Sequence, residues 1–161
     1  MNIVLYQPEI PSNTGNIGRS CMATNSSLHL IKPLGFSVDD KSIKRSGLDY
    51  WTDLDVHYYD NYEEFALKQK GQQVFFASTK AVKTYTEVRY SPNAFIVFGK
   101  ESAGIPEKIL LPNIDNCVRI PMSEKYRSLN LASSVAIVLY EALRQNGFEG
   151  LEREGKFRNY E

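Results

Sequence analysis

Glycines and small polar side chains follow an apolar run in the last third of the chain, in the segment FGKESAGIP at residues 98–106. Gly99 and Gly104 would let a ligand approach the main chain closely, because glycine has no side chain to block it. The Glu101 carboxylate can accept a hydrogen bond from a ligand hydroxyl or amine, or it can bond N–H groups of the loop; the residues alone leave both open. The segment therefore predicts a main-chain cradle for a small molecule.

A second strand-like run ends in RIPM at residues 119–122, and SLNLAS then leads into a helical pattern. Ile120 and Met122 offer main-chain groups beside an apolar wall, a combination that suits an adenine ring. Ser128 and Asn130 can cap the helix, bind a ligand, or do both. Two strand ends that deliver such loops to one edge of a sheet predict a site for a nucleotide-like cofactor.

A third loop, PEIPSNTGNIGR at residues 8–19, joins the first strand-like run to a helical pattern. Its glycines and a helix start favour an anion, but it lacks both the GK[ST] of a phosphate-binding loop and the GxGxxG spacing of a dinucleotide site. Alone it is consistent with a tight structural turn. Arg19 is more informative, because we expect it on the first turn of the helix at the carboxyl end of a strand, where open α/β sheets bind ligands.

Alternating short apolar runs and helical patterns must position these loops. Asn13 or Thr14 is expected to cap a helix over NTGNIGRSCMATN, and a second helix is expected after Asp60 or Asn61. This alternation predicts a single α/β domain over residues 1–161, with a largely parallel sheet and helices on both faces. The predicted buried strands, rich in Val, Ile, Phe and Tyr, are NIVLY, LHLIKP, VFFAST, AFIVFG and CVRIP.

The segment from Leu131 to Gln145 predicts a long helix that is apolar around most of its circumference. One covered face cannot bury all of it, and a self-complementary two-fold dimer is the commonest way to bury such a surface. The alternative is that residues 150–160 cover the helix. Tyr140 could serve the interface or the substrate, but we expect a packed aromatic.

Charge and composition exclude several function classes. The 161 residues carry 19 basic and 19 acidic side chains, so any RNA contact needs a local patch. No run is long and apolar enough to span a membrane, and no secretory signal is visible, which predicts a cytoplasmic protein. The candidate patches, each alone more typical of a solvated face, contain Lys41, Lys44 and Arg45, then Lys125 and Arg127, then Arg153, Lys156 and Arg158.

The cysteines and histidines show no catalytic or metal-binding pattern. Cys21 and Cys117 lie far apart without metal-ligand spacing, so we expect reduced, packed thiols and no metal site. His29 and His57 have no nucleophile motif nearby and are expected to be structural, which argues against a hydrolase.

Over nearly the whole chain, five motifs resemble those of the SPOUT RNA methyltransferases in their order and spacing. These motifs are NTGNIGR, KRSGLDYW, FGKESAGIP, RIPM and SLNLASSVAIVLYEA. The chain most resembles the minimal, single-domain family that methylates the 2′-hydroxyl of the wobble nucleotide of tRNA. The resemblance implies a trefoil knot in the C-terminal half, a homodimer paired through the long helix, and S-adenosylmethionine held in a bent form by main-chain groups. The implied cofactor-binding positions are Ser78, Gly99, Ile120, Ser128 and Leu129.

The resemblance also implies that Arg19 acts in catalysis, at a site shared between two subunits. Methyl transfer from a sulfonium to a ribose hydroxyl needs in-line positioning and loss of the hydroxyl proton. Because arginine keeps its own proton at neutral pH, we expect Arg19 to orient the phosphate or stabilise the oxyanion, while water or a neighbouring group accepts the proton.

The predicted activity is 2′-O-methylation of cytidine or modified uridine at position 34 of tRNA. Arg45 and the basic tail are the candidates for contact with the tRNA backbone. The alternative function is a non-catalytic α/β module that binds a nucleotide or RNA and transfers nothing.

Overall fold

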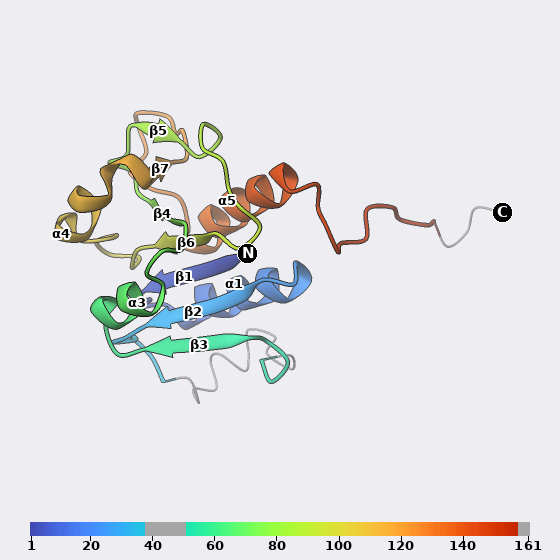
Figure 1. Cartoon of the computed structure of the whole chain (residues 1–161), viewed down its shortest axis with the longest axis horizontal. Helices are drawn as coiled ribbons and strands as arrows, with labels where there is room; N and C mark the ends of the chain where they lie inside the picture. The colour runs from blue at the N-terminus through green and yellow to red at the C-terminus, as the bar shows by residue number, and fades with distance from the viewer. Residues whose placement is uncertain (38–50, 158–161) are drawn as a thin grey trace.

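The computed structural model describes residues 1–37 and 51–157, so the predicted basic residues Lys41, Lys44, Arg45 and Arg158 lie outside the described part. Within it, seven strands form one sheet in the order β3-β2-β1-β6-β4-β7-β5, and neighbouring strands run parallel (Figure 1). The strands are β1 (Asn2–Tyr6), β2 (Ser27–Ile31), β3 (Val56–Tyr59), β4 (Val74–Ala77), β5 (Lys83–Thr84), β6 (Phe95–Phe98) and β7 (Cys117–Arg119). The helices are α1 (Pro11–Ala23), α3 (Tyr62–Lys68), α4 (Glu107–Leu110), the 3₁₀ helix η1 (Leu111–Asn116) and α5 (Leu131–Gln145).

Both faces of the sheet are covered, because successive side chains of a strand point to opposite faces. In β1, Ile3 and Leu5 belong to the core cluster that includes residues of α1 and α5. Val4 and Tyr6 belong to the second cluster, with residues of α3 and α4. Burial on both sides explains why the central strands are continuously apolar. The predicted α/β class, with a parallel sheet and helices on both faces, is confirmed.

All five predicted strands are present, and two further strands were missed. Both missed strands lie near the edges of the sheet, where less of the strand is buried. In β3 the side chains of His57 and Tyr58 are exposed, so the run VHYY lacks the apolar character of a central strand. The strand β5 has only two residues and leaves no periodic signal.

Helix α1 begins earlier than expected, so the prediction that Asn13 or Thr14 caps it is wrong. The N-cap is Ile10, without a side-chain hydrogen bond, and Pro11 opens the helix. Proline suits this place because its fixed φ is already helical and its missing N–H would have no helical partner. The expected start of α3 is confirmed, since the Asn61 side chain accepts a hydrogen bond from the Glu64 N–H at 2.8 Å.

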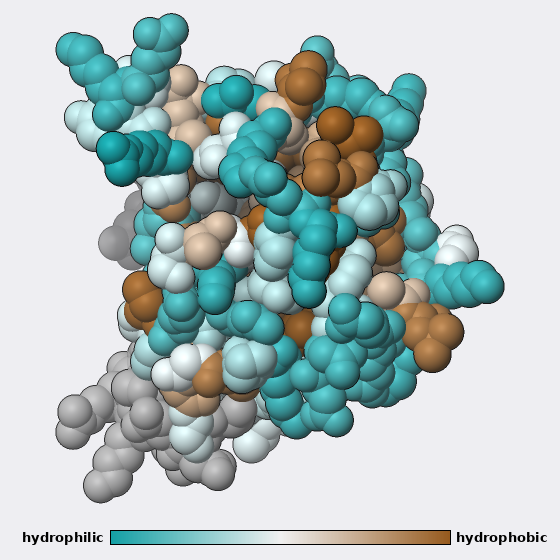
Figure 2. Space-filling model, turned by 90° about the vertical axis from the view of Figure 1, so that its left-hand side faces the viewer, coloured by the Kyte–Doolittle hydropathy of each residue, from teal (hydrophilic) through white to brown (hydrophobic). Residues whose placement is uncertain are grey.

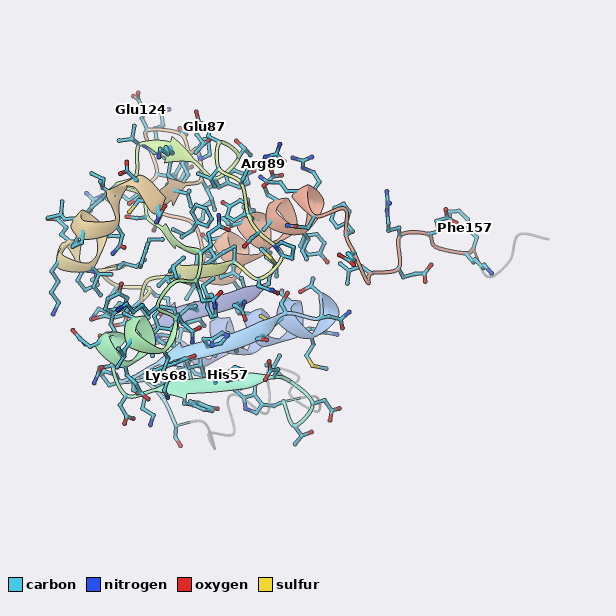
Figure 3. The ribbon with its side chains drawn as sticks, in the orientation of Figure 1. His57, Lys68, Glu87, Arg89, Glu124 and Phe157 are labelled. Atoms are coloured by element: carbon cyan, nitrogen blue, oxygen red, sulfur yellow. The ribbon has the colours of Figure 1, made fainter. Side chains whose placement is uncertain are left out.

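Helix α5 has the predicted bounds, and its Asn130 cap accepts a hydrogen bond from the Ser133 N–H at 3.2 Å. One side of α5 is buried in the core next to α1. The expectation that Tyr140 is packed is wrong, because 49% of this residue is exposed. Leu151 packs against the core cluster that includes residues of α5. Residues 152–157 are exposed and run away from the body, with Phe157 far out, so this described part of the tail does not cover the helix (Figures 1 and 3). Residues 158–160 lie outside the described part.

Both cysteines are free and buried, as expected. Burial raises the pKa of the Cys21 thiol to about 12. Among the described residues, no group of three or more His, Cys, Asp or Glu side chains could hold a metal ion. None of the helices in that part of the chain has the length and apolar character needed to cross a membrane.

The two histidines are structural neighbours. His29 is buried on β2, and its ring nitrogens lie 2.9 Å from the Tyr59 hydroxyl and 3.2 Å from Asn2 Oδ1. Its ring stacks on that of His57 with centroids 4.5 Å apart, and His57 pairs with Asp55 at 3.0 Å. Burial, followed by the neighbouring His57, lowers the pKa of His29 from 6.5 to about 4, while Asp55 opposes the shift.

Acid should therefore destabilise the protein through His29. Because the pKa of His29 is lower in the folded state, the unfolded chain binds more protons between pH 6.5 and pH 4. We expect the free energy of unfolding to fall by about 2 kcal/mol between pH 7.5 and pH 5. Urea denaturation at several pH values measures this loss. The His29→Gln variant should lose most of the dependence, and an unchanged slope in that variant would contradict the assignment.

Candidate functional site

A cleft of about 630 Å³ lies at the carboxyl ends of β4, β6 and β7. Figure 2 looks onto the side of the molecule toward which the strands point in Figure 1, and there apolar side chains are interspersed with polar ones. The cleft is lined by Ile10 and Asn13 of the N-terminal loop and α1, by residues 77–80 and 98–105, by Val118, Arg119, Ile120 and Met122, and by residues 127–131 with Ser134 and Val138 of α5.

The structure brings together the five predicted cofactor residues, Ser78, Gly99, Ile120, Ser128 and Leu129, all of which line this cleft. Arg19 is not among the lining residues. It is exposed in the third turn of α1, because the helix begins at Pro11, so the prediction that it stands on the first turn is wrong.

Position 99 requires glycine, because the main chain folds back closely on itself there. A Cβ atom at this position would lie 2.1 Å from the carbonyl carbon of Gly104 and 2.3 Å from the nitrogen of Ile105. The loop folds back so that the Gly104 N–H donates to the Lys100 carbonyl at 2.8 Å, and Gly104 adopts a φ of +70°. This tight turn forms one wall of the cleft.

The structure also decides what Glu101 does. Its carboxylate accepts hydrogen bonds from the N–H groups of Glu9 at 2.8 Å and Ile10 at 3.2 Å, and from the Asn13 side-chain amide at 2.9 Å. Between the same two loops, the Glu9 carboxylate accepts hydrogen bonds from the N–H and the hydroxyl of Ser102 at 2.9 and 2.8 Å, and these bonds lower the pKa of Glu9. Glu101 therefore anchors the N-terminal loop to the cleft.

The contact extends to α5, because the Asn130 side chain donates to Asn13 Oδ1 at 3.0 Å. Hydrogen bonds between the side chains of Glu101, Asn13 and Asn130 thus join the three loops that the sequence singled out. Asn13 was missed as a functional residue. The sequence marked it only as a candidate helix cap, in the segment NTGNIGR.

Replacing Glu101 with Ala should destabilise the fold by about 1–3 kcal/mol, because the N–H groups of Glu9 and Ile10 would lose their acceptor. Urea denaturation measures the loss. The matched control is Glu107→Ala, which removes an ion pair with Lys80 at an exposed site and should therefore have a much smaller effect on stability. Equal effects of the two substitutions would show that Glu101 does not anchor the loop.

The charged groups around the cleft favour an anionic ligand. Among the lining residues, Lys100, Arg119 and Arg127 are cationic, and so is Lys80, which pairs with the Glu107 carboxylate. Glu101 is the acidic side chain of the lining. Glu101 already accepts three hydrogen bonds from the protein. A neutral protein therefore presents a local basic rim here, which composition alone could not reveal.

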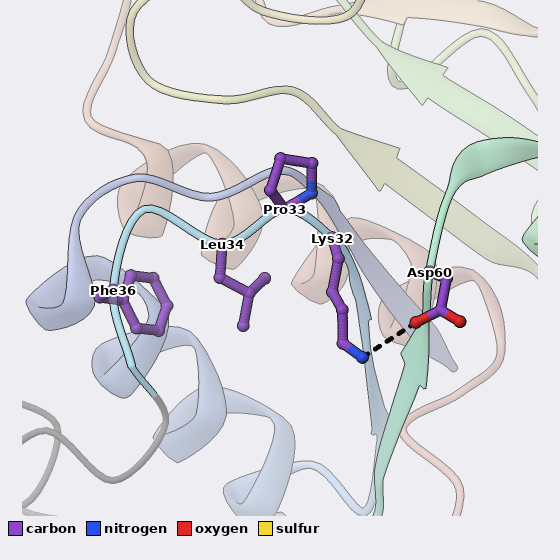
Figure 4. A pocket seen from close by; sticks show the side chains of 5 residues that line it. All are labelled: Lys32, Pro33, Leu34, Phe36 and Asp60. Carbon is purple, nitrogen blue, oxygen red and sulfur yellow. Dashed lines mark hydrogen bonds and ion pairs between the residues drawn. The ribbon is translucent and has the colours of Figure 1, made fainter.

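A second hollow, of about 440 Å³, lies beside the carboxyl ends of β2 and β3 and is lined by Lys32, Pro33, Leu34, Phe36 and Asp60 (Figure 4). Lys32 Nζ and the Asp60 carboxylate form an ion pair at 2.9 Å across it. The adjoining Gly35 touches the N-terminal loop, donating its N–H to the Pro8 carbonyl at 2.9 Å. Because Lys32 and Asp60 already pair with each other, this hollow is a poorer candidate for a ligand site than the larger cleft.

Comparison with known proteins identifies the family of this chain. The SpoU rRNA Methylase family matches residues 1–140. The chain belongs to this family. The predicted superfamily is therefore confirmed.

Individual family members are similar over almost their full length. A Listeria innocua protein, named as a proposed tRNA (cytidine(34)-2′-O)-methyltransferase, is 50% identical over 159 residues, which cover 97% of this chain and 94% of that protein. A solved structure described as giving insights into the 2-OH methylation of C/U34 on tRNA is 41% identical, has a TM-score of 0.86, and covers 91% of this chain and 95% of its own. An AdoMet-bound rRNA methyltransferase from Sinorhizobium meliloti is 25% identical with a TM-score of 0.80, and the match covers 89% of this chain and 55% of that one.

Proposed function

We propose that this protein transfers the methyl group of S-adenosylmethionine to the 2′-hydroxyl of nucleotide 34 of tRNA, a cytidine or a modified uridine. The observation that carries the proposal is the solved relative studied for methylation of C/U34, which is 41% identical over 91% of this chain. The cleft at the carboxyl ends of β4, β6 and β7 is the proposed site, within the single domain of residues 1–161. A tRNA substrate is consistent with the expected cytoplasmic location.

The cleft suits the proposed methyl donor. Its volume lies in the range of small-molecule sites, and apolar walls meet main-chain groups in it. Ile120 and Leu129 can cover the adenosine, while the turn at Gly99 and the main chain at Ser128 can bond its polar atoms. The Ser78 N–H already donates to the Val118 carbonyl at 2.9 Å, so Ser78 can offer only its carbonyl oxygen or its hydroxyl.

S-adenosylmethionine supplies a methyl group on a positively charged sulfur. When bound, it would give this methyl group to the ribose oxygen, and the hydroxyl proton would pass to water or a neighbouring base. The protein needs to hold donor and acceptor in line and to stabilise the developing oxyanion. We assign the second task, or the orientation of the adjacent phosphate, to the Arg19 guanidinium.

A homodimer would bring Arg19 to a cleft. Arg19 does not line the cleft of its own chain, and α5 carries a partly exposed side that includes Tyr140. If two copies of α5 pair, the N-terminal loop of one subunit can lie beside the cleft of the other. This arrangement supports a composite site, with Arg19 and the cofactor cleft contributed by different subunits.

Mass spectrometry of nuclease-digested tRNA tests the proposal. Purified protein, S-adenosylmethionine and unmodified tRNA should yield one added methyl group on the ribose of nucleotide 34. The matched control is the same tRNA with a 2′-deoxy nucleotide 34, which should remain unmethylated. Binding of tRNA without any methylated product would instead favour a non-catalytic RNA-binding module.

A further inference from the structure

We propose that Tyr126 is a stacking platform for the base of the nucleotide that is methylated. The inference rests on the proposed function and assigns a substrate contact to a residue outside the cofactor cleft. Tyr126 stands in the loop between β7 and α5, directly before Arg127, Ser128 and Leu129, which line the cleft.

The side chain of Tyr126 is unusually exposed for an aromatic residue. Its exposed fraction is 72%, whereas the rings of Tyr59, Tyr62 and Tyr90 pack against other rings. Within the described part of the chain, the Tyr126 ring makes no ring contact and its hydroxyl no hydrogen bond. The main chain of Tyr126 is held by a turn, in which its N–H donates to the Ser123 carbonyl at 3.1 Å.

The position of Tyr126 fits the geometry of the acceptor nucleotide. The base is attached to the ribose carbon next to the one that bears the acceptor hydroxyl. When that hydroxyl points into the cleft, the base stays close to its mouth, and residues 127–129 form one of the walls there. Aromatic side chains bind unpaired bases by stacking on their faces, whatever the base, and this tolerance suits an enzyme that acts on more than one pyrimidine.

Charged neighbours favour a nucleic acid over a hydrophobic partner at this loop. Lys125 and Arg127 flank Tyr126, and both are exposed. Glu124 is the opposing charge next to them and is exposed as well (Figure 3). Cations beside an exposed aromatic ring are the combination by which proteins hold single-stranded nucleic acid.

A double-mutant cycle tests this contact. One partner is Tyr126→Ala, and the other is tRNA with an abasic nucleotide 34, which keeps its 2′-hydroxyl. On intact tRNA, Tyr126→Ala should lower kcat/KM by roughly 5- to 150-fold, the range spanned by stacking on one base. On the abasic tRNA the same substitution should have no further effect. Tyr126→Phe should behave as the wild type, because it retains the ring.

Three controls separate this role from others. Calorimetry with S-adenosylhomocysteine should give the same affinity in Tyr126→Ala as in the wild type. Sedimentation should show the same oligomeric state, and dissociation by Tyr126→Ala would instead place the ring in a subunit interface and overturn the inference. Leu67→Ala, at an equally exposed apolar residue on α3, should leave kcat/KM unchanged.

An equal loss on intact and abasic tRNA would also overturn the inference, as would an unchanged kcat/KM. The same cycle can be measured by equilibrium binding of the anticodon stem-loop, which requires no methyl transfer. Failure of the wild type to methylate tRNA would refute the proposed function, whereas absence of coupling in the binding cycle would refute the role of Tyr126 alone.

Discussion

The Arg19→Ala variant is expected to lose methyl transfer to tRNA by roughly 100- to 1,000-fold, the effect of removing one group that stabilises a developing oxyanion. Its affinity for S-adenosylhomocysteine should stay at the wild-type value, because Arg19 is assigned to the acceptor ribose or its phosphate and does not line the cofactor cleft of its own chain. Single-turnover methylation and calorimetry measure the two quantities. The matched control is Arg89→Ala. Arg89 is exposed, and its main-chain carbonyl accepts a hydrogen bond from the Gln73 side chain at 2.9 Å, near the amino ends of the strands and not at the carboxyl ends that form the cleft.

A mixing experiment then asks whether the site is shared between subunits. The Ile120→Glu variant should fail to bind the cofactor, because a carboxylate would replace part of the apolar wall of the cleft. Neither this variant nor Arg19→Ala should be active alone. Mixed dimers should regain activity, since an intact cleft on one subunit would meet an intact Arg19 on the other. If mixing restores nothing although mixed dimers form, Arg19 does not act across the interface.

The Gly99→Ala variant is expected to lose about 3 kcal/mol or more of folding free energy, together with binding of S-adenosylhomocysteine. The added methyl group would lie 2.1 Å from the carbonyl carbon of Gly104, and rigid main chain cannot yield as a flexible side chain can. The turn closed by the bond from the Gly104 N–H to the Lys100 carbonyl would have to open. Urea denaturation and calorimetry measure the two losses.

Gly155→Ala is the matched control, because a Cβ atom there meets nothing within 4 Å. It should leave both stability and cofactor affinity unchanged. Wild-type affinity for S-adenosylhomocysteine in Gly99→Ala would show that the turn at residues 99–104 does not shape the binding site.

The site was predictable in part. The glycine turn after β6, the RIPM segment and the Asn130 cap are local patterns, and each lies where the sequence places it. The anchoring of the N-terminal loop was not predictable, because Asn13 meets Glu101 across 88 residues and Asn130 across 117 residues of chain. Sequence spacing says nothing about such contacts, which depend on how β1 and β6 lie side by side.

Local chemistry determined the elements of this protein: continuously apolar runs form buried parallel strands, and Asn130 and the apolar segment after it set the start of α5. The tertiary structure decided the rest. It turned Glu101 from a candidate ligand group into an anchor, placed Arg19 outside the cleft of its own chain, and left Tyr140 and Tyr126 exposed. These outcomes depend on the order of strands in the sheet, and strand order follows from packing between residues far apart in the chain.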